Sequence, residues 1–124
     1  LSVSGIATAA GAYTFQLVKR SAADTGGTSG AVTAVPLDSA YAAATGTVLA
    51  YTANPTLGAA VGAVAVKRAT VSTAAGAIPQ VIWEFDFTGS LVVLRGIAEV
   101  LALNLNATTM TGGALDVSVE WSEE

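Results

Sequence analysis

Two carboxylates lie close together in an otherwise apolar segment, and they are the residues best placed for chemistry. Glu84 and Asp86 stand two positions apart in the run from Val81 to Phe87, so an extended strand points both to one face. Paired carboxylates can bind a cation or act as a general acid and base. The same spacing is also the usual pattern of a solvated strand face, since aromatic residues occupy the alternate positions. We favour this second interpretation.

A second acidic group lies near the end of the sequence. Its members are Asp116, Glu120, Glu123 and Glu124. Carboxylate oxygens bind Ca²⁺, but a dedicated site takes closely spaced Asp and Asn ligands from one loop, and no segment here has that spacing. We therefore predict no metal site and no cofactor.

Nucleophilic catalysis lacks its usual base, because the sequence contains no histidine and no cysteine. Serine and threonine are plentiful, but a hydroxyl becomes a nucleophile only beside a group that takes its proton. A Ser-Lys pair stays formally open, although no spacing singles one out. We predict that the protein is not an enzyme.

Two tryptophans could serve as platforms on which sugar rings stack. Trp83 and Trp121 each continue a two-residue alternation of apolar side chains, however, and this places them in phase with the expected core. We therefore expect both rings to be buried, with their apolar surface against other core residues.

The composition favours protein partners over nucleic acid. Hydrophobic residues make up 52% of the chain and charged residues only 11%, against about 25% charged in ordinary soluble domains. Desolvating alanine or threonine costs less than desolvating a charge, so such a surface is suited to burial against other subunits. The net charge is −4 and the five basic residues are dispersed, which argues against phosphate binding.

The length of 124 residues predicts a single domain over 1–124. No apolar run approaches the roughly 18 to 20 residues of a membrane-spanning helix, so we expect no membrane span. The sequence begins at Leu1 with neither an initiator methionine nor a signal-peptide pattern. We therefore expect a processed or incomplete N-terminus, and these residues leave the compartment open.

Alternation of apolar and polar residues predicts about eight strands and at most one short helix. The clearest strands are 81–87 and 114–124, and the others expected are 1–5, 13–18, 32–37, 47–52, 61–73, 91–94 and 99–106. The unbroken apolar run 91–94 suggests burial on both faces. Asp38 or Ser39 offers an N-cap for a helix of about two turns over 38–45. Turn signals every 8 to 12 residues or so favour an all-β, jelly-roll-like β-sandwich, with an immunoglobulin-like sandwich as runner-up.

The basic residues have two interpretations each. The pairs Lys19-Arg20 and Lys67-Arg68 can face an acidic partner or, as we favour, keep apolar strand edges from pairing. Arg95 can orient a neighbouring subunit through a carboxylate, or pair within the chain with Glu99 or Glu84. The sequence does not decide between these partners of Arg95.

Four stretches resemble a group of small β-rich proteins found in the virions of tailed bacteriophages. They are Tyr13–Ser21, Ala50–Thr56, Val93–Gly96 together with Leu101–Asn106, and Val117–Glu123. The chain departs from the family pattern at Ala107, where glycine is usual, and at Ser122, where threonine is usual. The resemblance implies a jelly-roll-like protein that decorates or reinforces a capsid as a symmetric homo-oligomer such as a trimer.

The first functional hypothesis is therefore a structural virion protein, a capsid decoration or cementing subunit of the phage particle. Its partners would be copies of itself and the major capsid protein or another virion protein. The residues expected at the interface are the outward apolar side chains and one orienting charge: Val18, Leu49, Tyr51, Ile82 and Arg95.

Two alternatives belong to other classes. The first is an extracellular filament subunit whose N-terminal strand, residues 1–6, completes a neighbour's sheet. The second is a carbohydrate-binding module at a virion or cell surface. It predicts an exposed aromatic ring beside a carboxylate or amide, among Tyr13, Tyr41, Tyr51, Trp83 and Trp121.

Overall fold

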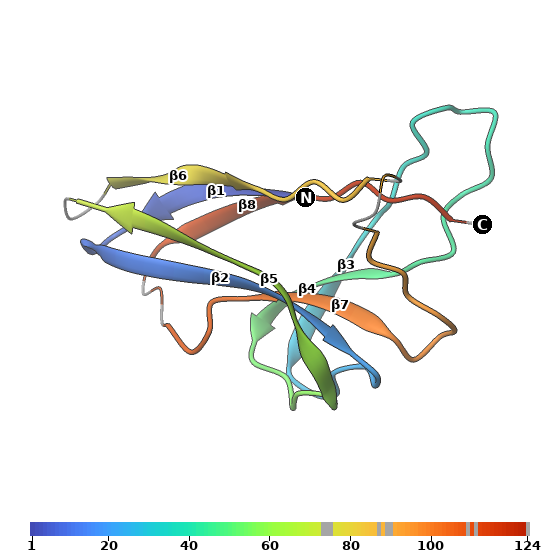
Figure 1. Ribbon diagram of the computed structural model, residues 1–124, viewed down its shortest axis with the longest axis horizontal. Helices are drawn as coiled ribbons and strands as arrows, with labels where there is room; N and C mark the ends of the chain where they lie inside the picture. Colours follow the sequence, from blue (N-terminus) through green and yellow to red (C-terminus); the bar gives the residue numbers. More distant parts are fainter. Residues whose placement is uncertain (73–75, 87, 89–90, 109, 111, 124) are drawn as a thin grey trace. The chain divides into compact units, whose positions relative to one another are not determined.

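The computed structural model describes residues 1–72, 76–86, 88, 91–108, 110 and 112–123. These residues form eight antiparallel strands in three sheets and no helix, so the predicted all-β class is confirmed (Figure 1). The architecture agrees with a β-sandwich. The specific strand order of a jelly roll stays a prediction.

The chain divides into two compact units. The sandwich unit comprises Leu1–Ala23 and Ala59–Glu120, and the ribbon unit comprises Asp24–Gly58 with the chain from Trp121 onwards. These units are defined by their internal contacts and do not fix the number of domains, so a single domain over 1–124 stays a prediction.

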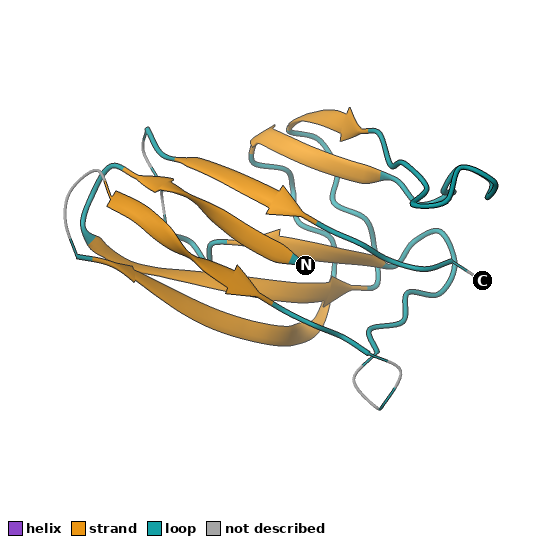
Figure 2. Cartoon of the chain, turned by 90° about the horizontal axis from the view of Figure 1, so that it is seen from above, coloured by secondary structure: helices purple, strands orange, loops and turns teal. Residues whose placement is uncertain are grey.

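The sandwich unit contains two three-stranded sheets, whose strands are among the orange arrows of Figure 2. The first has the order β6-β1-β8, made of β6 (Gly76–Ile82), β1 (Ser2–Ala7) and β8 (Ala114–Ser118). The second has the order β5-β2-β7, made of β5 (Ala60–Val71), β2 (Gly11–Arg20) and β7 (Val100–Asn104). The first two strands of the sequence are thus the central strands of the two sheets.

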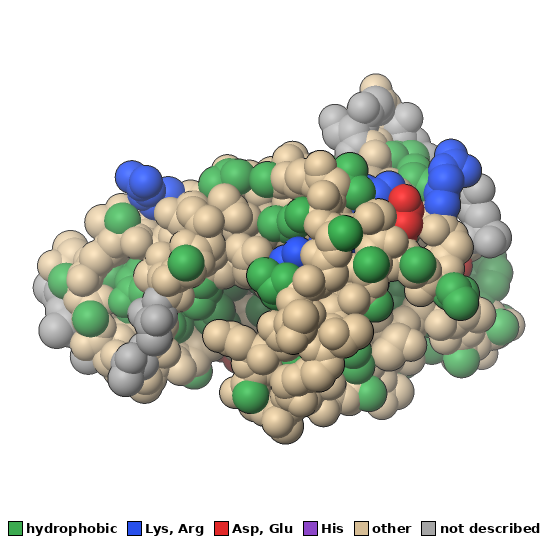
Figure 3. All heavy atoms as spheres, turned by 90° about the horizontal axis from the view of Figure 1, so that it is seen from below, with side chains coloured by type: hydrophobic (Ala, Val, Ile, Leu, Met, Phe, Trp, Pro, Cys, Tyr) green, Lys and Arg blue, Asp and Glu red, His purple; other side chains and the backbone are tan. Residues whose placement is uncertain are grey.

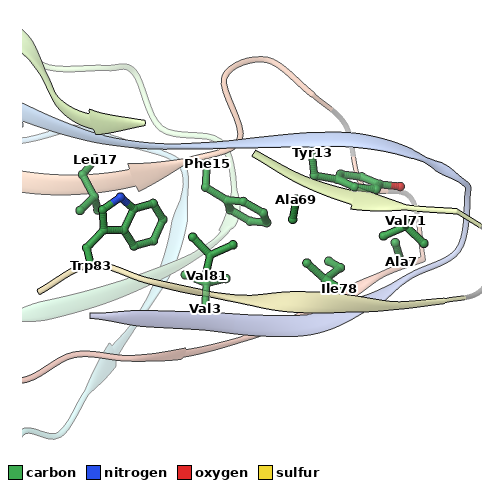
Figure 4. Packing of buried hydrophobic residues seen from close by; sticks show 10 residues of the cluster. All are labelled: Val3, Ala7, Tyr13, Phe15, Leu17, Ala69, Val71, Ile78, Val81 and Trp83. Carbon is green, nitrogen blue, oxygen red and sulfur yellow. The ribbon is translucent and has the colours of Figure 1, made fainter. Parts of the chain in front are cut away.

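The core lies between these sheets because alternate side chains of both point inward. In β2 the inward residues Tyr13, Phe15 and Leu17 are buried, while Thr14 and Gln16 between them are not. The first sheet contributes Val3, Ala7, Ile78, Val81 and Trp83, and the second adds Ala69 and Val71 (Figure 4). Burial of an aliphatic or aromatic side chain contributes about 1.5–3 kcal/mol. The expected core position of Trp83 is confirmed at 4% exposure.

One side of the sandwich is closed by contacts between the edge strands β5 and β6. Lys67 lies on the inward face of β5, opposite Phe15, and its Nζ donates a hydrogen bond to the carbonyl of Ile82. The same ammonium lies 5.9 Å from the centre of the Trp83 ring. An inward-pointing charge on an edge strand is a known device against edge-to-edge pairing, so Lys67 fits the gatekeeper interpretation.

Pro79 lies at an irregular position on the other closing strand. The β1–β6 register shifts between Val3 and Gly5, so that Pro79 and Gln80 together stand opposite Ser4. Proline cannot donate to the ladder, and edge strands and bulges are the sheet positions that tolerate it. The expected strand 81–87 is wrong beyond Ile82: β6 begins earlier, at Gly76, and residues 83–86 form no strand.

The ribbon unit contains a two-stranded sheet of β3 (Thr28–Val32) and β4 (Val48–Ala53). The expected strand over 32–37 is wrong except at Val32, because the pairing with β4 ends at that residue. The expected helix over 38–45 is also wrong. Asp38 accepts a hydrogen bond from the N–H of Ala40 at 2.9 Å, so the N-cap residue caps an isolated turn.

Two further strand predictions fail in the sandwich unit. Residues 91–94 form no strand and are largely exposed, because no neighbouring strand pairs with them. The closing strand ends at Ser118, and Trp121 beyond it is 42% exposed, so its expected core position is wrong. Phe87, also expected in phase with the core, lies outside the described residues.

Candidate assembly surface

Among the described residues, the large apolar side chains that are exposed outnumber those that are buried. In the sandwich unit they gather on the first half of β5, on the loop 91–97 and on β8. The residues of these segments are Val61, Val64, Val66, Leu91, Val93, Leu94, Ile97 and Val117, with Val119 just after β8, and Ile6 and Ile82 are exposed elsewhere in the unit. Figure 3 shows one face of the molecule with few charged groups among apolar and neutral atoms. Single exposed apolar residues are ordinary, but contiguous groups of them mark interaction surfaces.

The loop 91–97 is held in place by hydrogen bonds to Lys19 and Glu99. Lys19 Nζ lies 2.9 Å from Glu99 Oε2 and donates to the carbonyl of Val93 at 2.7 Å. The same Glu99 oxygen accepts the backbone N–H of Arg95 at 2.6 Å. The hydrogen bond from Lys19, then that from Arg95, lowers the pKa of Glu99. Val93 is thus bonded directly to Lys19 of β2, and Arg95 is linked to it through Glu99, while Ile97 stays fully exposed.

The ribbon unit carries a second set of exposed apolar residues. Leu49 and Tyr51 share one face of β4, and both are exposed, as expected of interface residues. Val35, Leu37 and Tyr41 lie in the segment between β3 and β4 and are among the most exposed apolar residues. The sequence named Tyr41 only as an aromatic ring for the carbohydrate alternative, and the expected strand 32–37 gave no signal that Val35 and Leu37 are this exposed.

The predicted interface residues lie on separate elements. Ile82 ends β6 and is exposed, and Arg95 is exposed on the loop 91–97. The outward position expected for Val18 is wrong, because its side chain is only 7% exposed. It stands opposite Ala63 and Ala102 in the ladder, at a register shift of β2 against β5.

Asp86 and Glu84 are not brought to a common site. Asp86 accepts hydrogen bonds from the backbone N–H and the hydroxyl of Thr88, and these bonds lower its pKa. Glu84 instead lines a shallow depression of about 230 Å³, together with Glu120, Leu1 and Ile82 among others. In the described part of the chain, no three His, Cys, Asp or Glu side chains gather around one point.

Glu123 accepts four hydrogen bonds from residues of its own unit. One oxygen accepts the indole N–H of Trp121 at 2.9 Å and the N–H of Gly46 at 2.8 Å. The other accepts the N–H and the hydroxyl of Thr45 at 2.8 and 2.7 Å. These bonds, that from Trp121 first, lower the pKa of Glu123 to about 2. The sequence had suggested only membership of an acidic group.

The aromatic residues divide by exposure. Tyr13 and Trp83 are buried, whereas Tyr41, Tyr51 and Trp121 are exposed. Trp121 thus meets the condition of an exposed ring beside a carboxylate, since it bonds Glu123. The four hydrogen bonds to Glu123 come from the protein itself and use its acceptor capacity, which leaves that carboxylate little to offer a sugar.

No helix long and apolar enough to cross a bilayer occurs among the described residues. Comparison of the chain with protein-family models, with curated proteins and with solved structures finds no match.

Proposed function

We propose that the chain is a structural virion protein that decorates or cements the capsid of a tailed bacteriophage. It assembles as a symmetric homo-oligomer, a trimer, and contacts the major capsid protein or another virion protein in the particle. Its activity is mechanical, since it adds subunit contacts that hold the lattice together.

The observation that carries this proposal is the excess of exposed large apolar side chains on a weakly charged chain. Free monomers rarely expose extensive apolar surface. Its burial on association contributes about 2.5 kcal/mol of binding free energy for each 100 Å², before the costs of ordering are subtracted. A standard interface of about 1,600 Å² offsets those costs, and closed symmetry repeats the contact around a ring.

Leu49, Tyr51 and Ile82 supply apolar interface area, and Arg95 orients the partner through a carboxylate. The loop 91–97 adds Ile97, whose full exposure makes it the most prominent apolar side chain of the sandwich unit. The bonds of Glu99 hold this loop in place, so less entropy is lost when a partner covers it.

The test begins with the mass of the purified full chain by size-exclusion chromatography with light scattering. We expect three times 12.2 kDa, and antibodies against the chain should label the capsids of purified phage particles by immunogold microscopy. Ile97→Ser should lower incorporation into particles, whereas the control Ser72→Ala, at another exposed position, should not. A monomer that is absent from particles would refute the proposal.

A carbohydrate-binding module is the second candidate, because Trp121 is exposed beside Glu123. Its test is a glycan array with the full chain and with Trp121→Ala. Binding that the substitution removes would favour this candidate, and an array without signal would count against it.

The filament alternative, extracellular polymerisation by exchange of residues 1–6, requires these residues to leave their own sheet. In this chain β1 already lies between β6 and β8, and its Val3 is fully buried in the core. Deleting β1 would therefore unfold the sheet in any assembly. Electron microscopy of the full chain separates the alternatives, since filaments in the absence of phage particles would favour strand exchange.

A further inference from the structure

The strand β8 is an unprotected edge of the first sheet. It pairs with β1 on one side, from Ser2 opposite Ser118 to Ile6 opposite Ala114, without a register shift. On its other side the sheet order ends, and within the described residues no strand follows. Natural edges are blunted by short strands, charges, proline or bulges. The five-residue β8, with the sequence ALDVS, has no proline, lysine or bulge, and Asp116 is its single charge. The opposite edge, β6, has both Pro79 and a register shift.

The inner face of β8 is also incompletely covered. Val117 stands opposite Val3 in the ladder, yet Val3 is fully buried whereas Val117 is 51% exposed. Val119, two residues on, is exposed as well, and Leu115 is half-buried. The contacts that close the sandwich between β5 and β6 have no counterpart between β7 and β8. An apolar stripe therefore runs along a free edge.

The charge pattern of β8 limits the registers in which a second copy can pair with it. Residues opposite one another in an antiparallel pair must point to the same face, so a two-fold axis passes through a residue of β8. An axis at Asp116 places that carboxylate opposite its own copy, and an axis at Ser118 places Asp116 opposite Glu120. Like charges directly opposite one another destabilise a pair. Axes at Ala114, Leu115 and Val117 all avoid a charge conflict, but the first two place Val117 opposite residues that precede β8. The axis at Val117 places Asp116 opposite Ser118 and Leu115 opposite Val119, so it alone pairs the apolar side chains of the stripe with one another.

We propose that β8 pairs with β8 of a second copy, antiparallel, about a two-fold axis at Val117. The pair joins the two sheets into one with the order β6-β1-β8-β8-β1-β6. It brings Leu115, Val117 and Val119 of both copies into a single apolar cluster. This inference rests on the self-assembly in the proposed function. The two-fold contact is additional to the contacts within the proposed trimer, because it joins a subunit of one trimer to a subunit of another.

Disulfide cross-linking tests the register directly, because the natural sequence has no cysteine. Opposed residues of a pair have Cβ atoms about 4.5–5.5 Å apart. The full-length variant V117C should therefore form disulfide-linked dimers under mild oxidation. Asp116→Cys and Ser118→Cys should cross-link poorly alone but readily when the two variants are mixed. The mixed pair also keeps the test valid if V117C fails to fold, which circular dichroism would reveal.

Charge variants give a second measurement that needs no oxidation. Ser118→Lys places an ammonium opposite Asp116 of the partner at both ends of the pair, and should tighten self-association severalfold in analytical ultracentrifugation. Ser118→Asp places two carboxylates opposite each other, and should weaken it by a similar factor. The control Thr70→Asp changes the charge at an exposed residue of β5 and should have no such effect.

The outcomes separate this inference from the proposed function. If Asp116→Cys alone forms dimers, the proposed register is wrong. If no variant cross-links, or if V117C cross-links only to another virion protein, the β8–β8 pairing is wrong. Labelling of capsids would leave the proposed function intact in those cases. Conversely, V117C dimers of a chain that never labels particles uphold the pairing and remove the virion function.

Discussion

At the scale of single residues, Ala107 carries the clearest strain in the described chain. Asn106 and Ala107 have φ values of 49° and 62°, and the N–H of Thr108 donates to the carbonyl of Leu105 at 3.0 Å. Two central residues with positive φ characterise the type I′ turn, which favours Asn-Gly. Alanine is unfavourable at the second of these positions, because its Cβ is disfavoured in the left-handed region.

We expect Ala107→Gly to stabilise the protein by about 1 kcal/mol, because glycine occupies the left-handed region without the Cβ clash. Urea unfolding followed by circular dichroism measures the change. Ala10→Gly is the matched control at an exposed position without positive φ, and should destabilise by about 0.5–1 kcal/mol. Equal effects of the two substitutions would contradict the turn geometry.

Glu123 provides a second prediction at this scale. Its pKa is lowered to about 2 from 4.5, so the stabilisation it gives is fully present above about pH 4.5. That stabilisation declines as the pH falls toward 2, because protonation removes the charged acceptor of the bonds from Trp121, Thr45 and Gly46. The indole N–H resonance of Trp121 should therefore titrate with a midpoint near 2 in NMR spectra.

The variant Glu123→Gln should abolish this titration, and Glu120→Gln should leave it unchanged. A midpoint near 4.5 in the natural chain would mean that the carboxylate is solvated and does not hold Trp121.

At the scale of elements, period-two patterns predicted the strands that have a buried face. Alternation found β2 and most of β7, and it placed the start of β8 at Ala114. It failed at 91–94, because four consecutive apolar residues have no period and their contacts are set by the tertiary fold. The helix over 38–45 failed because an N-cap residue equally caps an isolated turn, and alanines offer no apolar stripe to pack.

The candidate surface was less predictable than the strands. The exposure of Leu49, Tyr51 and Ile82 followed from their outward phase, whereas the burial of Val18 depends on a register shift that no sequence pattern marks. The bonds of Glu123 join residues 77 and 78 positions apart, a separation over which local patterns carry no information.

The pairing of β1 with β8 gives a prediction for an element. A Cβ built on Gly5 would lie 2.1 Å from the carbonyl oxygen of Ala114, so Gly5→Ala must push the two strands apart. Gly62→Ala is the matched control, because Gly62 has nearly the same φ, 158° against 156°, and no atom near its built Cβ. We expect Gly5→Ala to lose about 1–3 kcal/mol more than the control in urea unfolding. Similar losses would show that β1 and β8 do not approach so closely.

At the scale of the whole molecule, association is expected to depend little on salt. The exposed surface carries few charges, so screening by NaCl removes little attraction, whereas sulfate strengthens apolar burial. The oligomer distribution in analytical ultracentrifugation should change little between 0.05 and 1 M NaCl, because the Debye length becomes about four to five times shorter and this weakens only interactions between charges. Dissociation at 1 M NaCl would instead assign the assembly to ion pairs such as those of Arg95.

The central place of β1 also bears on how the protein is made. Both of its neighbours, β6 and β8, are encoded far downstream, so a growing polypeptide leaves the ribosome with its first strand unpaired on both sides. Distant pairings form slowly, because the intervening loop must close first. The first sheet is therefore completed only after residues 114–118 have been synthesised. Nascent chains that stop earlier lack the edge proposed for joining subunits, so only chains that extend past Ser118 could form that contact.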